Sequence, residues 1–201
     1  MLYIHKKPIK FVRDSQMLSD FKKFKEKQVL CEFYLDPDDL SKFCVGYIVD
    51  YDKENCLIAC LDSYGNKDGF FCFKVEDLIK IQTDTQYLIC LTKILSYNND
   101  KEYYTQKIDF KGVNKPFINR VFDYIQKEKK VASFELVENG LKDFYGFISE
   151  ISDDTLVIQQ ISCYGCLDGF VQVDAETITN ITFNSQDEQK IEILYSLESK
   201  K

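Results

Sequence analysis

Residues 46–81 read GYIVDYDKENCLIACLDSYGNKDGFFCFKVEDLIKI, and residues 146–181 read GFISEISDDTLVIQQISCYGCLDGFVQVDAETITNI. The two stretches align without a gap, and ten aligned positions are identical. They are Gly46/Gly146, Ile48/Ile148, Ile58/Ile158, Tyr64/Tyr164, Gly65/Gly165, Asp68/Asp168, Gly69/Gly169, Phe70/Phe170, Glu76/Glu176 and Ile81/Ile181. Because self-similarity at a fixed period indicates a repeated structural unit, we expect the 201 residues to form two units in tandem. Each unit is long enough to bury a small core of its own.

The repeat divides the chain into two predicted domains, residues 1–95 and 115–201, with the polar stretch 96–114 as a linker. Residues 1–13 form a basic N-terminal arm of the first domain. Each domain is expected to begin with an amphipathic helix, at 14–28 and at 114–130, because apolar side chains recur there at helical spacing. These side chains are Met17, Leu18, Phe21 and Phe24 in the first helix, and Ile118, Val121, Phe122 and Ile125 in the second.

Five short β-rich segments follow each predicted helix. They cover residues 29–35, 44–53, 55–63, 69–82 and 86–95 in the first unit, and 131–137, 144–152, 155–163, 169–183 and 189–198 in the second. Short polar breaks separate several of them, as expected of hairpins. The segment from Cys56 to Leu61 is apolar on both faces, which favours a central strand of a small barrel. The predicted fold class is therefore α+β and mainly β, with each unit a helix followed by a bent five-stranded antiparallel sheet.

The first predicted hairpin carries a short motif. Gly46 is followed by Asp52, and Asn55 opens the next apolar segment. Together with a helix followed by five strands, this pattern resembles the Sm and Sm-like family. The resemblance implies two tandem Sm-like barrels, and it implies that Asp52 and Asn55 help to hold an RNA base. The second unit has Ser152 and Thr155 at the matching positions, so the resemblance places the base pocket in the first unit alone. Another small barrel built from a bent sheet is the alternative fold.

The net charge of −7 is unevenly distributed along the chain. Residues 1–28 hold eight Lys or Arg against three Asp or Glu, while the strand-rich parts are acidic. An acidic protein repels a polyanion before contact, which argues against indiscriminate binding of nucleic acid. A basic helix can still form a local positive face, and Lys22, Lys23 and Lys25 lie outside the apolar stripe of the first predicted helix. These lysines, with Asp52 and Asn55, are the candidate RNA-binding residues.

The sequence contains no glycine-rich phosphate loop and no nucleophile elbow. The carboxylates Asp68 and Asp168 are duplicated, one in each unit, as residues that determine a fold are. Cys163 and Cys166 form a Cys-x-x-Cys, but a structural zinc site needs a second pair of ligands. The single histidine, His5, has no partner for acid–base work near it in the sequence. We therefore predict no enzyme activity, no catalytic or cofactor-binding residue, no cofactor and no metal site.

Eight cysteines are distributed unequally, with six in the first unit and two in the second. Disulfides that staple a repeated unit would recur in both copies, so most of these cysteines are interpreted as small buried hydrophobic residues in a reducing compartment. No apolar run approaches the roughly 18 residues of a membrane span. The basic N-terminal arm also lacks the apolar segment of a secretory signal. We expect a cytoplasmic protein that does not enter a membrane.

The function predicted from these observations is binding without catalysis. A bent five-stranded sheet leaves edge strands whose backbone N–H and C=O groups lack partners, and such strands pair with another chain. We therefore expect a module that acts in protein–protein interaction or assembly, including regulatory interaction. Its partner is another protein, or a second copy that associates through the barrel edge strands. RNA binding through the barrel and the basic helices is the alternative, and its affinity would fall steeply with salt.

Overall fold

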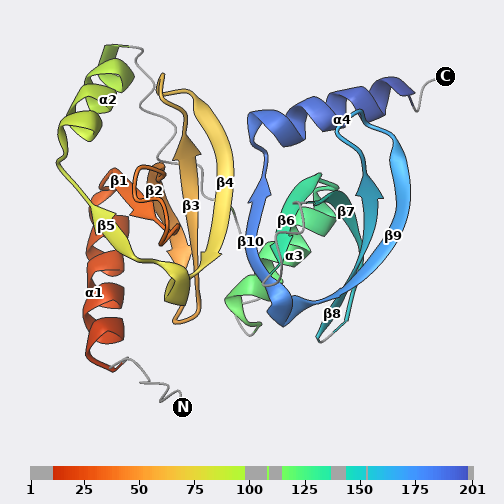
Figure 1. The fold of residues 1–201 in the computed structure, drawn as a ribbon, viewed down its shortest axis with the longest axis horizontal. Helices are drawn as coiled ribbons and strands as arrows, with labels where there is room; N and C mark the ends of the chain where they lie inside the picture. The colour runs from red at the N-terminus through yellow and green to blue at the C-terminus, as the bar shows by residue number, and fades with distance from the viewer. Residues whose placement is uncertain (1–10, 98–107, 109–114, 137–143, 153, 199–201) are drawn as a thin grey trace, which may run out of the picture.

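The computed structural model describes residues 11–97, 108, 115–136, 144–152 and 154–198 (Figure 1). Over these ranges the chain is an α+β protein whose ten antiparallel strands form one continuous open sheet. Four α-helices accompany the sheet in the same ranges. They are α1 (Phe11–Lys27), α2 (Gln86–Tyr97), α3 (Phe117–Lys127) and α4 (Gln186–Glu198). Every helix in the described part of the chain is too short or too polar to span a bilayer.

Each unit supplies five strands to the sheet. The first unit holds β1 (Cys31–Tyr34), β2 (Cys44–Tyr51), β3 (Asn55–Leu61), β4 (Lys67–Lys74) and β5 (Lys80–Gln82). The second holds β6 (Ala132–Leu136), β7 (Phe144–Ile151), β8 (Thr155–Ile161), β9 (Leu167–Asp174) and β10 (Ile178–Phe183). The strand order is β5-β1-β2-β3-β4-β10-β6-β7-β8-β9, so the two units join where β4 pairs with β10.

The strand pairing repeats between the units at a spacing of 100 residues. Ile48 of β2 lies opposite Ile58 of β3, and Ile148 of β7 lies opposite Ile158 of β8. The register shifts directly after Ile48 in the first hairpin and directly after Ile148 in the second. The ungapped repeat in the sequence therefore corresponds to equal pairing in the sheet.

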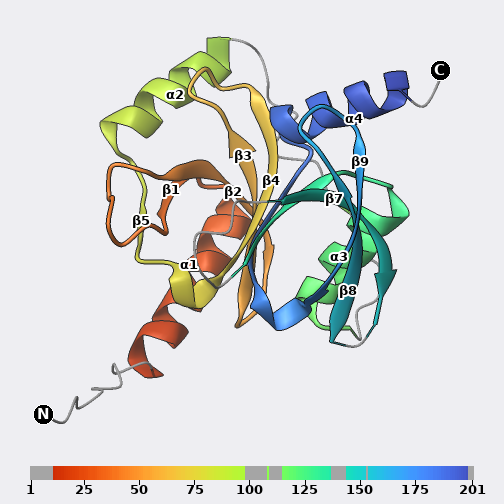
Figure 2. The same cartoon turned by 45° about the vertical axis from the view of Figure 1, so that its right-hand side comes forward.

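The repeated Tyr-Gly turns are explained by the helices that cover them. α2 and α4 lie at the same end of the molecule (Figure 1 and Figure 2). A Cβ atom added at Gly165 would lie 2.5 Å from the backbone nitrogen of Tyr195 in α4, and one at Gly65 would lie 3.2 Å from Leu95 in α2. Glycine thus lets the closing helix of each unit rest on the turn between the third and fourth strands of that unit.

The fifth β-rich segment predicted in each unit is wrong, because residues 86–95 and 189–198 belong to α2 and α4. α2 buries three of its own leucines, which recur at helical spacing: Leu88, Leu91 and Leu95. In α4 the Ser185 backbone nitrogen donates to Glu188 Oε2 at 2.9 Å, which is one half of a capping box. Helical burial and a cap therefore outweigh the strand propensity of these short apolar runs.

The predicted segments 69–82 and 169–183 each contain two strands. A 3-10 helix, η1 (Val75–Asp77) or η3 (Ala175–Thr177), separates them. The predicted α+β class with five antiparallel strands in each unit is confirmed, but the two predicted barrels do not close, since β4 pairs with β10 of the other unit and the sheet stays open. Of the predicted linker 96–114, all but residues 96, 97 and 108 lies outside the described residues, as does the arm before residue 11.

The hydrophobic core extends across both units. One cluster lies under α1 and includes Phe21, Phe33 and Phe73. The largest cluster combines β3 and β4 with α3 and β10, so that Phe70 and Phe183 belong to the same core. The predicted helix stripes face the core: Phe21 in α1 and the α3 residues Val121, Phe122 and Ile125 are fully buried or nearly so. The other stripe residues, Met17, Leu18, Phe24 and Ile118, are partly buried and pack against it. Burial of this shared core holds the two units together.

Candidate functional site

The junction between the units is a pair of antiparallel strands, β4 and β10, in the centre of Figure 1. Phe70 of β4 lies opposite Phe183 of β10, and their rings stack with centroids 5.2 Å apart. Only 4% of Phe70 and none of Phe183 is exposed to solvent. Gly69 precedes Phe70 and has a φ of 72°. A Cβ atom there would lie 2.5 Å from the Phe183 carbonyl oxygen, so β10 rests directly on this glycine.

Polar contacts surround the strand pair. Lys74 Nζ donates to the carbonyl oxygen of Glu176 at 2.6 Å. At the other end, Gln186 at the start of α4 donates its backbone nitrogen to Asp68 Oδ1 and its side-chain nitrogen to Asp62 Oδ2, both at 3.3 Å. These contacts hold both ends of β4 to the second unit.

Asp50 links the two N-terminal helices across the junction. Its carboxylate lies 2.6 Å from Lys25 Nζ in α1 and 3.9 Å from an Arg120 guanidinium nitrogen in α3. Arg120 also lies over the ring of Phe117, 5.2 Å from the centroid. The residue that joins α1 to the sheet therefore also contacts the second unit.

β9 is the counterpart of β4 in the second unit, and it is the last strand of the described sheet, at the right-hand side of Figure 1. Gly169 has a φ of 76°, close to that of Gly69, but a Cβ atom added there would meet nothing within 4 Å. Phe170 is 64% exposed and Leu167 is 46% exposed. The same Gly-Phe pair is thus covered by a strand in one unit and open in the other.

Polar residues replace apolar or basic ones around the open edge. Gln172 of β9 stands where β4 has the buried Cys72, and Asp174 stands where β4 has Lys74. Gln172 and Asp174 are both exposed. Charged and polar side chains on an edge strand limit unspecific aggregation while leaving its backbone groups available for pairing. β9 is therefore an end strand of the described sheet that carries polar and acidic side chains.

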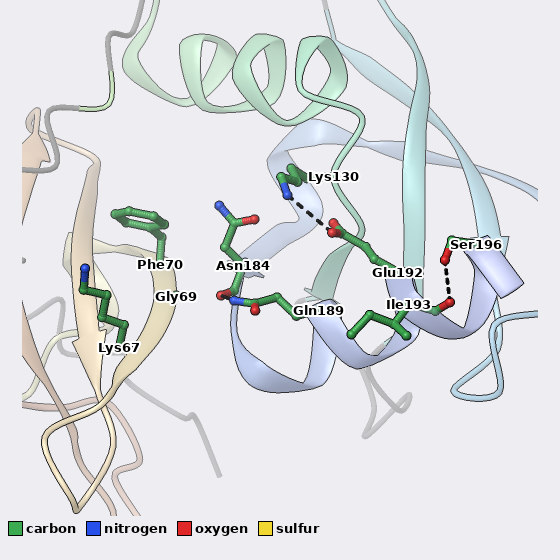
Figure 3. A pocket seen from close by; sticks show the side chains of 9 residues that line it. All are labelled: Lys67, Gly69, Phe70, Lys130, Asn184, Gln189, Glu192, Ile193 and Ser196. Atoms are coloured by element: carbon green, nitrogen blue, oxygen red, sulfur yellow. Dashed lines mark hydrogen bonds and ion pairs between the residues drawn. The ribbon is translucent and has the colours of Figure 1, made fainter.

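A hollow of about 540 Å³ lies beside the junction, between β4 and α4 (Figure 3). Lys67 and Phe70 line one side of it, and Gln189, Glu192 and Ile193 line the other. Lys130 Nζ lies 3.3 Å from Glu192, so the charge of this lysine is balanced within the hollow. No group of three or more His, Cys, Asp or Glu side chains in the described ranges is arranged to hold a metal ion.

The predicted base-binding pair forms part of the β2–β3 hairpin. Asp52 Oδ1 accepts hydrogen bonds from the backbone nitrogens of Glu54 at 2.8 Å and Asn55 at 2.7 Å. Asn55 is only 8% exposed. The structure therefore brings Asp52 and Asn55 together, with the Asp52 carboxylate engaged by the turn.

The predicted basic face is spread over α1. Lys22 and Lys23 are exposed, and Lys22 lies 3.9 Å from Glu26. Lys25 is turned toward the sheet, where it contacts Asp50. RNA binding through these lysines with Asp52 and Asn55 stays a prediction.

Replacing Asp52 by alanine should lower the free energy of unfolding by about 1 kcal/mol, because two backbone donors in the turn lose their acceptor. Chemical denaturation of the two proteins measures the difference. Lys53→Ala, a change at the exposed neighbouring position, is the control and should be neutral within about 0.5 kcal/mol. Equal stability of Asp52→Ala and the parent protein would show that the carboxylate is not needed by the hairpin.

All eight cysteines lie in the described ranges, and each is a thiol outside any disulfide. Burial is the main cause that raises the pKa of Cys31 to about 12 and of Cys44 to about 11, and it raises the pKa values of Cys56, Cys60 and Cys72 well above the ordinary range. These five thiols stay protonated at neutral pH, and the thiolate is the reactive form. The remaining three, Cys90, Cys163 and Cys166, are exposed.

A disulfide reagent that labels thiols should therefore modify about three cysteines rapidly in the native protein. It should modify all eight after denaturation without a reductant. The absorbance of the released thiol counts both classes. Rapid modification of all eight in the native state would contradict the burial, and a low count after denaturation would contradict the predicted reducing compartment.

Comparison with known proteins gives no family for this chain. No family model matches it, and no curated protein matches it. One solved structure, described as the P2(1) crystal of K. pneumonia MrkH, aligns over 93% of this chain and 94% of that chain with 12% identity and a TM-score of 0.19. A likeness that low carries no conclusion about fold or function.

The residues of the open edge could not be recognised as a site from the sequence. Phe170 and Gly169 are identical to Phe70 and Gly69, so the alignment presents the two edges as the same. The two edges do differ in charge at other aligned positions, because Lys74 in the first unit corresponds to Asp174 in the second. This difference could be interpreted only once the structure showed which of the two edges is covered.

Proposed function

We propose that this protein is a non-catalytic binding module that acts through protein–protein interaction, and that β9 is the strand that receives its partner. The carrying observation is the contrast between the covered Gly69-Phe70 pair and the open Gly169-Phe170 pair. A helix followed by five antiparallel strands, present in both units, supports an Sm-like character for the units as part of the same proposal.

An added strand would gain from two sources at this edge. The outer backbone N–H and C=O groups of β9 would exchange water for the ladder of a new strand, the mode known as β-augmentation. Phe170 would be buried, which contributes about 1.5–3 kcal/mol for a large apolar side chain. The β4–β10 junction supports the proposal because it is an example of this geometry within the same chain.

A labelled peptide with the sequence of residues 177–186, which contain β10, is a suitable probe for this edge. The full chain should bind it, and Phe170→Ser should weaken the binding at least tenfold, because the peptide phenylalanine loses the ring on which it stacks. Fluorescence anisotropy measures both affinities. Tyr64→Ser is the matched control, since Tyr64 is 74% exposed on a turn of the first unit. No binding, or equal binding by the parent and Phe170→Ser, would refute the proposal.

A further inference from the structure

We infer that the strand received by β9 belongs to a different protein, is basic, and carries an aromatic residue opposite Phe170, and that pairing with a second copy of this chain is disfavoured. This inference rests on the proposed function of β9. The β4–β10 junction provides the template, because it shows which side chains a strand must carry to cover an edge of this kind.

A second copy could present its own β9, but that pairing would bring the exposed aspartates of the two acidic edges together. The other free strand of the described sheet is β5, at its opposite end. β5 is three residues long, whereas β10 is six residues long. Thr83 occupies the position of Phe183, so Phe170 would find no ring on which to stack. Asp84, with a φ of 57°, occupies the position of Asn184, with a φ of 59°, and would bring a carboxylate next to Asp168.

The polar contacts of the junction would also be lost in such a dimer. Asp174 replaces Lys74, and Ser162 replaces Asp62. The helices α1 and α3 correspond at an offset of 101 residues, as shown by Gln28 and Lys129, which both have positive φ. At that offset Ser19 takes the place of Arg120, which contacts Asp50 across the junction.

Among the polar contacts described for the junction, a dimer could keep the hydrogen bond between Gln186 and Asp68. Gln86 of one copy and Asp168 of the other are the matching residues. A single surface hydrogen bond contributes little against the lost stacking and the opposed carboxylates. The pairing of β4 with β10 inside the monomer is therefore favoured, and the corresponding pairing of β9 with β5 between copies is disfavoured.

The charge of the open edge indicates the partner. Asp168, Asp174 and Glu176 are all exposed along or next to β9. The two lysines of β4, Lys67 and Lys74, correspond to Leu167 and Asp174, so the covered edge is mixed in charge and the open edge is acidic. Charge complementarity favours a basic strand at such an edge and disfavours an acidic one.

The register of the junction places the basic residues of that strand. Phe73 lies opposite Asn180 and Phe70 lies opposite Phe183. Continued by the same antiparallel count, position 179 of a β10-like strand faces Asp174 and position 185 faces Asp168. A peptide of residues 177–186 with Thr179→Lys and Ser185→Lys should therefore fit the edge, while Thr179→Glu and Ser185→Glu should oppose it.

The test compares three labelled peptides on the full chain: the basic peptide, the acidic peptide, and residues 77–86, which contain β5. We expect the basic peptide to bind at least tenfold more tightly than the acidic one, with a preference that shrinks as salt rises. The double change Asp168→Asn and Asp174→Asn should remove most of the preference, whereas Glu54→Gln, an exposed change in the first unit, should not. Light scattering should show a monomer at the concentrations used.

Two results overturn the inference and leave the proposed function standing. The first is that the acidic peptide binds as tightly as the basic peptide or more tightly. The second is that the 77–86 peptide binds, or that the chain associates with itself, in a way that Phe170→Ser abolishes. If none of the three peptides binds and the 177–186 probe also fails, the proposed function fails, and the inference fails with it.

Discussion

Gly69→Ala should destabilise the protein by about 3 kcal/mol more than Gly169→Ala, as expected for an overpacked contact. Both glycines have a positive φ, so both substitutions carry the same backbone strain. At Gly69 the new methyl group would lie 2.5 Å from Asn184 and Phe183 backbone atoms, and at Gly169 it would meet nothing within 4 Å. The difference between the two variants therefore isolates the contact between β4 and β10.

Denaturant unfolding of the two variants and the parent protein measures this difference. Gly169→Ala is its own control, since it reports the cost of the φ angle alone. Equal destabilisation by the two substitutions would mean either that β10 does not rest on Gly69 or that Gly169 is also covered in solution.

Phe183→Ala should lower the free energy of unfolding by about 3–5 kcal/mol, the range for a phenylalanine deleted from a core. Phe183 is fully buried and contacts the rings of Phe70 and Tyr124, with centroids 5.2 Å and 5.8 Å away. Phe170→Ala removes the same kind of side chain from an exposed position and should cost no more than about 0.5 kcal/mol.

Thermal and denaturant unfolding of these two variants provide the comparison. A loss below about 1 kcal/mol for Phe183→Ala would show that the units are held together elsewhere. A large loss for Phe170→Ala would show that Phe170 is buried in solution by a surface that the monomer does not supply.

The hairpins inside each unit could be predicted from the sequence because the same strand and turn pattern occurs in both units. The alignment of residues 46–81 with 146–181 fixes which positions are equivalent, and the β2–β3 and β7–β8 hairpins follow it. Polar breaks such as the one before Asn55 mark the hairpin turns. Local sequence is sufficient here because both partners of each hairpin lie within a few residues of the turn.

The closing helices were missed although their signals were present. Leu88, Leu91 and Leu95 have helical spacing, and Ser185 followed by Glu188 is a capping box. The same runs contain isoleucine, tyrosine and threonine, which favour strands, and the Sm-like resemblance implied a fifth strand at this place. For these two segments the helical spacing of the leucines and the capping box indicated the secondary structure better than the strand-favouring composition did.

The candidate site could not be predicted, because it depends on which edge of one unit meets the other. Gly69-Phe70 and Gly169-Phe170 are the same in sequence, and they differ only in whether β10 lies on them. The resemblance directed attention to Asp52 and Asn55 instead, where the structure shows an Asp52 carboxylate engaged by its own turn. The contact joins segments about 110 residues apart, and differences such as that between Lys74 and Asp174 do not show by themselves which edge is covered.

Hydrogen exchange in β4 and β9, resolved by residue, tests most directly whether β9 is an open edge that takes a strand. Segments 69–73 of β4 and 169–173 of β9 occupy equivalent positions, but within the described sheet β4 has a neighbour on both sides and β9 on one. We expect alternate amides of β9 to exchange rapidly in the free protein and slowly with the basic peptide bound, while β4 stays protected throughout. Slow exchange of every β9 amide in the free protein, or no added protection at saturating peptide, would contradict this account.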